Sequence, residues 1–296
     1  MINGLLLAFS ITCGVTGSGF RYRIARDSLK TMGDNAAFNL ILSLVCILVM
    51  AVAGGLRRPS LLTLLLSVVF GLLIILAGLS SVAAMHNGPM TLSVLISLCG
   101  TLIPTTVGSL LWREPVTPFQ IAGIVLMLLS MALVLNPTVN SKITARWIAW
   151  ALASFLLNGL IGLTQKIQST SIYADEKMQF LFWSFVISAL FLLGYLLAIR
   201  RARPGACVGC SFRGKLGAGA VLVGLTNAAQ HIINLILVGL IPAAVFFPIC
   251  NGGNILLTGL MGAVVFKERM TRWQIVGFVL GIFAILLVAN VASAFS

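Results

Sequence analysis

One predicted helix, at residues 216–239, carries four polar side chains that share a single face. They are Asn227, Gln230, His231 and Asn234, at positions i, i+3, i+4 and i+7 of a helical repeat. Amide and imidazole groups donate and accept hydrogen bonds without a fixed charge, so this face suits recognition of a small polar solute. His231 could also titrate near neutral pH, and the alternative for it is a neutral, hydrogen-bonded imidazole.

A second polar group is expected on the predicted helix 242–266, where Asn251 and Asn254 flank two glycines just after Pro248. A proline removes one backbone hydrogen bond and glycines loosen the helix, so free carbonyl groups can face a cavity there. Polar side chains of two further predicted helices are expected to join them. The complete predicted cavity lining is Asn227, Gln230, His231, Asn234, Asn251, Asn254, Asn158, Gln165, Ser97 and Thr101. For each amide the alternative is an interhelical hydrogen bond worth about 0.6 kcal/mol, but four such groups on one face favour a cavity.

The elements that carry these side chains are predicted to be membrane helices. Charged residues make up 8% of the 296 residues and the mean hydropathy is +1.10, whereas soluble domains contain roughly 25% charged residues. Apolar runs of about 20 residues, the length that spans a bilayer, follow one another along the chain. They predict ten helices, near 2–20, 36–56, 60–82, 89–112, 118–136, 147–166, 178–199, 216–239, 242–266 and 272–292.

The chain also repeats itself. The segment REPVTPFQIAGIVLMLLSMALV, which starts at Arg113, returns from Lys267 as KERMTRWQIVGFVLGIFAILLV. The residues that match in register are Glu114, Thr117, Gln120 and Gly123 with Glu268, Thr271, Gln274 and Gly277, and, near the start of each half, Gly14, Gly17 and Arg21 with Gly159, Gly162 and Lys166. We therefore predict two five-helix repeats, 1–140 and 141–296. An odd number of spans in each repeat inverts the second copy in the membrane, which is typical of transporters.

The repeated polar residues have structural explanations. Thr117 and Thr271 are predicted to cap the helices that follow them, and Gln120 and Gln274 to complete capping boxes. Glutamates precede both caps, at 114 and 268, where a helix N-terminus favours a carboxylate, and a role in transport is the alternative. The repeated glycines are predicted to let neighbouring helices approach closely in lipid.

The Glu-x-x-Thr-x-x-Gln-x-x-Gly turn that begins the last helix of each half resembles that of the EamA-like carriers of the drug/metabolite transporter superfamily. The resemblance covers essentially the full chain, although Arg113 and Lys267 stand where that family commonly has glycine. It implies an all-α integral membrane fold of ten helices in two inverted repeats around a central cavity. It also implies a secondary transporter, an exporter or an exchanger, that moves a small polar or zwitterionic metabolite such as an amino acid by alternating access.

The same resemblance implies a multi-pass protein of the plasma (inner) membrane of a bacterium, present as a monomer or a homodimer. A lipid flippase, an accessory subunit and a multidrug efflux carrier of this superfamily are the alternatives. The first predicted helix holds no acidic residue between positions 2 and 20, which disfavours acid-dependent antiport of cationic drugs.

Other classes of protein fit the composition less well. The net charge of +13 comes from basic residues in short predicted loops, where membrane orientation and anionic lipids explain it without a nucleic acid. A membrane-embedded enzyme would need paired carboxylates, metal ligands or a nucleophile with its base, but the six acids are scattered. The pair Cys207 and Cys210 lacks the second pair that zinc would require. We expect no enzymatic activity, no cofactor and no metal, and we expect a small-molecule substrate and membrane lipid as partners.

Membrane orientation is predicted in two conflicting ways. If the N-terminus were cytoplasmic, fourteen of the nineteen Lys and Arg residues would lie in outer loops. The positive-inside rule therefore places both termini outside, whereas the family resemblance implies cytoplasmic termini. Because loop charge fixes orientation during insertion, we predict that both termini lie outside.

Overall fold

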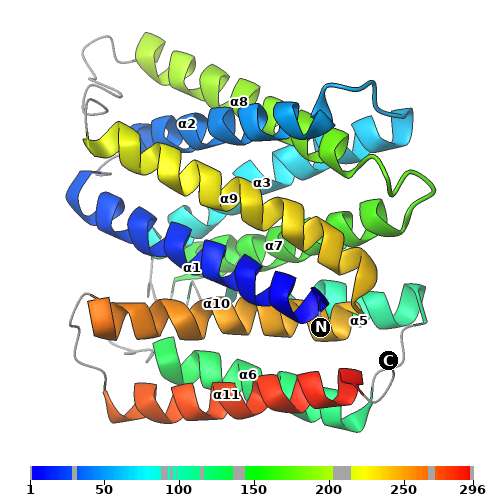
Figure 1. Ribbon diagram of the computed structural model, residues 1–296. Coiled ribbons are helices and arrows are strands. Elements are labelled where there is room, and N and C mark those ends of the chain that lie inside the picture. The colour runs from blue at the N-terminus through cyan, green and yellow to red at the C-terminus, as the bar shows by residue number, and fades with distance from the viewer. Residues whose placement is uncertain are drawn as a thin grey trace. The chain divides into compact units, whose positions relative to one another are not determined.

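The structure is a computed structural model that describes residues 2–28, 32–87, 93, 96–97, 99–113, 117–135, 144–202, 215–265 and 271–293. These residues form helices and turns, and they contain no strand. The helices are α1 (Ile2–Ser28), α2 (Met32–Met50), the π-helix η1 (Ala51–Gly55), α3 (Leu61–Asn87), α5 (Leu102–Leu111), α6 (Pro118–Leu135), α7 (Ala145–Thr170), α8 (Lys177–Ala202), α9 (Lys215–Leu240), α10 (Ala243–Val265) and α11 (Arg272–Ser293) (Figure 1). The prediction of an all-α chain is confirmed for the described residues.

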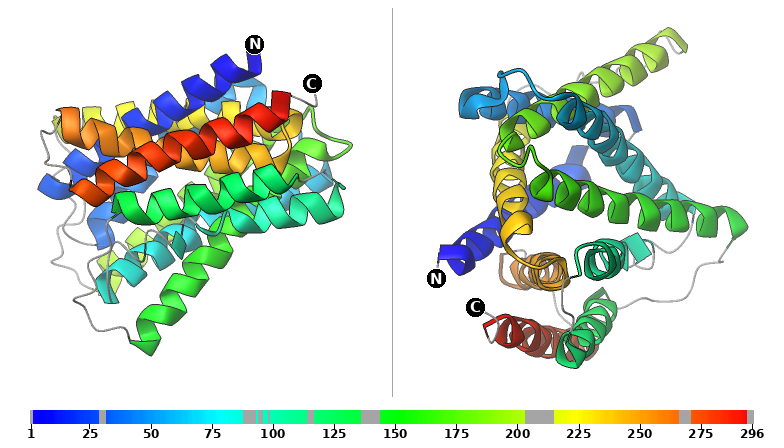
Figure 2. Two further views of the ribbon diagram at one scale, coloured as in Figure 1. Left: turned by 90° about the horizontal axis from the view of Figure 1, so that it is seen from below. Right: turned by 90° about the vertical axis from the view of Figure 1, so that its right-hand side faces the viewer.

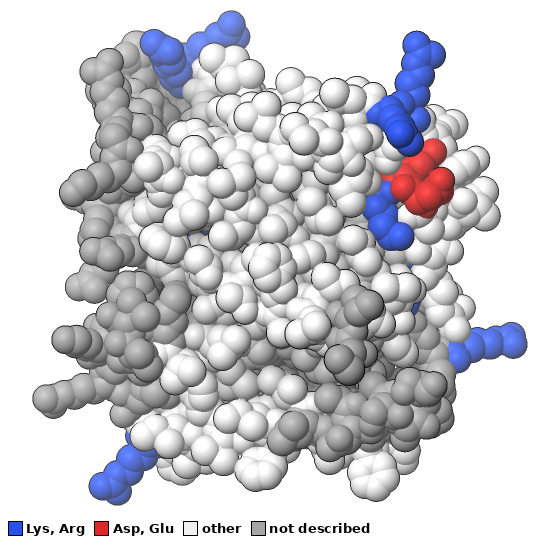
Figure 3. Space-filling view, in the orientation of Figure 1, with Lys and Arg blue, Asp and Glu red and all other residues white. Residues whose placement is uncertain are grey.

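Six stretches of the described helices are long and apolar enough to cross a membrane. They are Asn3–Arg21, Gly33–Gly55, Leu61–Ala84, Ala145–Thr170, Lys177–Arg201 and Gly217–Leu240. Large apolar side chains on these helices face outward: Leu5 and Val52 are 68% and 91% exposed. Uncharged side chains cover most of the described surface in Figure 3. Such an apolar exterior suits a lipid environment.

A turn at Gly100 and Thr101 interrupts the predicted helix 89–112 before α5 begins at Leu102. The cause is Pro104, which has no N–H group to donate to the carbonyl of Gly100, four residues earlier. The N–H of Ile103 donates to that carbonyl instead, at 3.0 Å, in the tighter i→i+3 pattern. The structure therefore places the break of this predicted helix one turn before the proline.

The described chain separates into two compact units. One comprises Met1–Ile75 and Gln168–Ile236, and the other comprises Leu76–Ile167 and Leu237–Ser296. The boundaries fall within α3, α7 and α9. Each unit combines residues from both predicted repeats, so the compact units are not the repeats, and the repeat boundary near residue 140 stays a prediction.

In the first unit, α2 and η1 pack against α8, and α3 packs against α8 through backbone contacts. The hydroxyl of Ser188 donates to the carbonyl of Gly71 at 3.0 Å, and that of Ser67 donates to the carbonyl of Phe180 at 3.0 Å. A methyl group at Gly71 would lie 2.6 Å from the carbonyl oxygen of Ser184. Close approach of α3 and α8 therefore depends on a residue without a side chain.

A carboxylate joins the start of α3 to the start of α8 in the same unit. Glu176 Oε2 accepts hydrogen bonds from the backbone N–H of Ser60 at 2.9 Å and from its hydroxyl at 2.8 Å. Burial acts to raise the pKa of Glu176, but hydrogen bonds from Thr63 and Ser60 lower it by more, so the pKa lies below its ordinary value. The ionised carboxylate thus stabilises this corner of the unit.

In the second unit, α6 and α11 lie side by side and run in opposite directions (Figures 1 and 2). Met127 and Met131 of α6 pack on Ala284 of α11, and all three are buried. The hydroxyl of Ser130 donates to the carbonyl of Gly277 at 2.6 Å. These two helices carry the repeated sequence, so the repeat-related elements of this chain pack against each other in antiparallel fashion.

Candidate functional site

One of the four polar residues on the face of α9, Asn234, forms a hydrogen bond to another helix of the first unit. Asn234 Oδ1 accepts a hydrogen bond from the hydroxyl of Ser10 in α1. Asn227 and Gln230 are half-buried, and their side chains form no hydrogen bond to a described residue. Two amides of the predicted lining therefore keep their donors and acceptors available among the described residues.

His231 lies against aromatic rings. Its ring centroid is 5.3 Å from that of Phe185 and 6.2 Å from that of Phe70, with interplanar angles of 75° and 88°. This edge-to-face geometry is the preferred packing of ring pairs. The Nδ1 atom is buried and has no hydrogen-bond partner among the described residues.

The amides of α10 are turned onto their own helix in the second unit. Asn251 Nδ2 donates to the carbonyl of Phe247 at 3.1 Å, and Asn254 Nδ2 donates to that of Cys250 at 2.8 Å. Asn254 Oδ1 is buried and lacks a partner in the described part of the chain. Because the structure describes the polar residues of α9 and those of α10 in different units, the single cavity predicted from them stays a prediction.

Four side chains of the second unit form a hydrogen-bonded group, which we call the serine–asparagine cluster. It consists of Ser81 on α3, Ser97 on the helical segment before α5, and Ser154 and Asn158 on α7. Asn158 Nδ2 donates to Ser97 Oγ at 2.9 Å and to the carbonyl of Ser154 at 2.8 Å. The hydroxyl of Ser154 donates to Ser97 Oγ at 2.8 Å, and Ser81 Oγ lies 2.7 Å from Ser154 Oγ and 3.4 Å from Ser97 Oγ.

Sequence reasoning found two members of this cluster and missed the other two. Ser97 and Asn158 were predicted to line a cavity, whereas Ser81 and Ser154 were not singled out. The position of Ser154, one turn before Asn158 on the same face of α7, was the available signal.

Two other predicted lining residues lie outside the cluster. Gln165 on α7 is only 6% exposed, and its amide forms no hydrogen bond to a described residue. Thr101 lies in the turn before α5, where its carbonyl accepts a hydrogen bond from the hydroxyl of Thr105 at 2.8 Å. Thr101 thus supports the local backbone of the interrupted helix.

Two basic residues near the ends of predicted helices lie within helices of the structure. Arg21 is inside α1, which continues to Ser28; its Nη2 donates to Asn39 Oδ1 at 3.3 Å, and its Cζ is 5.9 Å from the ring centroid of Phe38. Lys166 is inside α7 and 4% exposed, and its Nζ donates at 3.1 Å to the carbonyl of Val238 in the last turn of α9. Cations are favoured by the carbonyl groups at a helix C-terminus. The predicted helix 2–20 ends too early, because a helix can continue beyond its apolar run.

The repeated glycines lie where neighbouring side chains or backbone come close. A methyl group at Gly17 would lie 2.8 Å from Thr226 Oγ1, and one at Gly162 would lie 2.9 Å from the Phe247 ring. A methyl group at Gly159 would lie 2.7 Å from the carbonyl oxygen of Gly100, so the absence of a side chain lets α7 approach the segment that carries Ser97. Close glycine packing in this unit therefore helps to position the serine–asparagine cluster.

The repeated turns are partly described. At the start of α11 the backbone N–H of Thr271 donates to Gln274 Oε1 at 2.8 Å, and that of Gln274 donates to Thr271 Oγ1 at 3.3 Å. These are the two hydrogen bonds of a capping box. In the other copy, Thr117 precedes α6, whose first residue is Pro118. Gly123 and Gly277 are buried in α6 and α11, whereas Glu114, Glu268 and the side chain of Gln120 lie outside the described residues.

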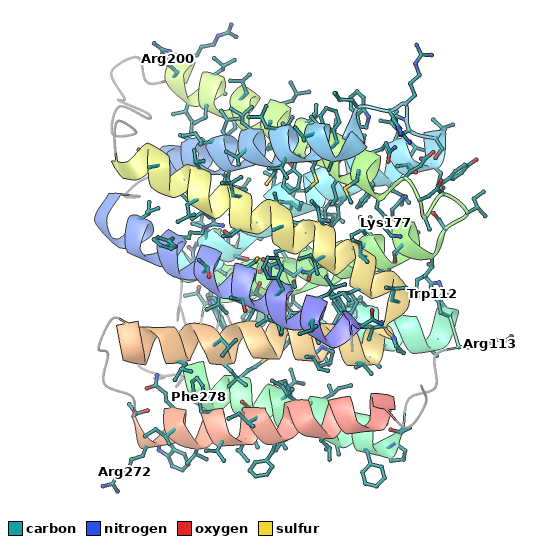
Figure 4. The ribbon with its side chains drawn as sticks, viewed as in Figure 1. Trp112, Arg113, Lys177, Arg200, Arg272 and Phe278 are labelled. Atoms are coloured by element: carbon teal, nitrogen blue, oxygen red, sulfur yellow. The ribbon has the colours of Figure 1, made fainter. Side chains whose placement is uncertain are left out.

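Arg113 adopts a left-handed backbone conformation, with φ of 50°. It follows Trp112 at the end of α5 (Figure 4). Glycine takes up this conformation at little cost and a residue with a Cβ does so at a larger one. Arg113 therefore carries backbone strain that a glycine at this position would not.

The described residues contain no group of three or more His, Cys, Asp or Glu side chains that could hold a metal ion. Cys207 and Cys210 lie outside the described residues. The described candidate residues of each unit are thus mainly uncharged hydrogen-bonding groups.

The fold of the chain is similar to that of a solved structure described as "Crystal structure of protein". The TM-score is 0.76 at 13% sequence identity, over 99% of this chain and 98% of that chain. At this identity the similarity shows the fold alone. No family model matches the chain, and no curated protein matches it.

Proposed function

We propose that the protein is a secondary transporter of small polar or zwitterionic metabolites, built as ten membrane helices in two inverted five-helix repeats. Its predicted resemblance to EamA-like carriers of the drug/metabolite transporter superfamily supports this proposal. The proposed location is the plasma (inner) membrane of a bacterium, and the proposed mechanism is alternating access.

The serine–asparagine cluster is the observation that carries the proposal. Ser81, Ser154 and Asn158 lie inside helical stretches that are long and apolar enough to cross a membrane. A polar group transferred into hydrocarbon without a partner costs about 2–7 kcal/mol, so polar groups inside such helices face one another or a solute path. Uncharged groups of this kind suit a solute that is small, polar and without strong net charge.

The packing of α6 on α11 supports the inverted arrangement. These helices carry the two copies of the repeated sequence and run antiparallel (Figure 1). Two copies inserted with opposite topology would give this relation between equivalent helices, whereas two copies with the same topology would run parallel.

Transport in proteoliposomes tests the proposal. The purified protein is reconstituted and assayed for uptake and efflux of an amino-acid and nucleobase panel, with and without a pH gradient. We expect saturable movement of one solute class, which His231→Leu and Asn254→Leu abolish without loss of the folded protein. Thr106→Val, at an exposed position of α5, is the control and should transport normally. Absence of transport for every solute in the panel contradicts the proposal, and full activity of both leucine variants contradicts the assignment of these two residues.

A further inference from the structure

We infer that Asn158 Oδ1 is the acceptor for an N–H group of the transported solute. This inference rests on the proposed transport function and names the chemical class of its substrate. It follows from the acceptors to which the donor groups of the serine–asparagine cluster are hydrogen-bonded.

The cluster contains five side-chain polar hydrogens, two on the Asn158 amide and one on each of three serines. Both amide hydrogens are used, one on Ser97 Oγ at 2.9 Å and one on the carbonyl of Ser154 at 2.8 Å. Ser154 donates to Ser97 at 2.8 Å. Either oxygen can be the donor in the pairs Ser97–Ser81, at 3.4 Å, and Ser81–Ser154, at 2.7 Å, so the three hydroxyls can close a ring. In that arrangement every donor of the cluster has an internal acceptor.

Asn158 Oδ1, in contrast to these donors, is an acceptor without a partner in the cluster. It accepts no hydrogen bond from a described residue, and Asn158 is half-buried. The cluster thus presents an acceptor without a spare donor, and the group that satisfies it must bring its own hydrogen. A carboxylate has none to offer, whereas an ammonium or an amino group attached to a ring does.

The direction of this oxygen is fixed by the same hydrogen bonds. The two N–H bonds run to different segments, one to Ser97 and one to the backbone of α7 itself. An amide group is planar, so holding its nitrogen on two sides also orients its oxygen. Such prior ordering lowers the entropic cost of binding. Ser97 is therefore a positioning residue that acts on the solute through Asn158.

Paired solutes with and without an N–H group test the inference in proteoliposomes. The pairs are L-alanine with propanoate, in which the donor is an ammonium, and 9-methyladenine with 9-methylpurine, in which it is a neutral amino group. The wild type should transport the N–H member of at least one pair and discriminate against its partner. Removing the acceptor with Asn158→Leu should raise KM for that member by about 10-fold or more, and Ser97→Ala should raise it by about 3-fold.

Conservative variants keep the test independent of folding. Ser97→Thr retains the hydroxyl and should restore the wild-type KM. Asn158→Asp retains an acceptor oxygen and should transport the N–H solute better than Asn158→Leu. The matched control is Thr164→Val, on the same helix, where the hydroxyl donates to the carbonyl of Leu160 at 2.8 Å.

Each outcome decides between the claims. Equal transport of both members of every pair, or an unchanged KM in a folded Asn158→Leu variant, overturns the inference and leaves the transport function standing. If the wild type moves none of the four solutes but moves others of the broader panel, the inference is overturned as well. A protein that moves no solute at all overturns both.

Discussion

Substitution of Gly71 by alanine should destabilise the protein, because this glycine lies where α3 meets the backbone of α8. The added methyl carbon would lie 2.6 Å from the carbonyl oxygen of Ser184 and 3.1 Å from Ile187 Cβ. The oxygen belongs to a helix backbone and cannot rotate away. Restoring an ordinary contact of 3.4 Å or more would move α3 and α8 apart by about 0.8 Å locally.

A separation of that size also breaks a hydrogen bond. The distance from Ser188 Oγ to the carbonyl of Gly71 is 3.0 Å, and it would stretch to about 3.8 Å, beyond the range of a hydrogen bond. Overpacking costs about 1–3 kcal/mol, and the lost bond adds about 1 kcal/mol. We therefore expect Gly71→Ala to lower the free energy of unfolding by roughly 2–4 kcal/mol.

Gly78 provides a matched control on the same helix. A methyl group there would meet nothing within 4 Å, so Gly78→Ala should be neutral or stabilise α3 by up to about 1 kcal/mol through helix propensity. Reversible unfolding in mixed micelles, followed by circular dichroism, measures both variants. If Gly71→Ala proves as stable as Gly78→Ala, close backbone packing of α3 on α8 is not what the structure indicates.

Three further predictions concern pH, backbone strain and orientation. Because the folded-state pKa of Glu176 is lowered, its stabilising effect is present above the ordinary value of about 4.3 and is lost as the pH falls through the folded value. The melting temperature of the wild type should therefore fall with acidification over that window, and Glu176→Gln should reduce this fall. Identical pH profiles of the two proteins would contradict the role of the bonds between Glu176 and Ser60. Arg113→Gly should stabilise the protein by about 1 kcal/mol, since glycine adopts a positive φ without strain, and Arg113→Val should destabilise it. A higher melting temperature for Arg113→Val than for Arg113→Gly would contradict the backbone strain at this position. A fluorescent protein fused to the C-terminus should remain dark if the positive-inside rule sets the orientation, and strong cytoplasmic fluorescence would show that the family resemblance is the better guide.

Features that depend on short stretches of sequence were predictable. Apolar runs gave the all-helical class, and the Thr271–Gln274 capping box, whose partners are three residues apart, is present at the start of α11. Glycine contacts at Gly17 and Gly162 also agree with expectation. In each case the residues that produce the feature lie within a few positions of it in the sequence.

Features that depend on partners far apart in sequence were harder to predict. A serine in a helix usually bonds the carbonyl one turn earlier, so nothing in the sequence distinguishes Ser81 from the other serines, and only its spacing from Asn158 marks Ser154. Their participation in the cluster is set by Ser97, 16 residues away from the first and 57 from the second. The helical position of Arg21 was missed because a basic residue can extend a helix beyond its apolar run, with its charge held by an amide oxygen.

The left-handed glycine inside η1 limits how this chain can vary. Gly54 has φ of 99°, and a side chain at this position would meet nothing within 4 Å. Every amino-acid replacement that one base change can make in a glycine codon adds a Cβ atom, which this backbone conformation disfavours. Mutation at this site is therefore restrained although no neighbouring atom is in the way. An inventory of contacts would rank Gly54 among the freest positions of the protein, whereas its torsion angle makes it one of the most constrained.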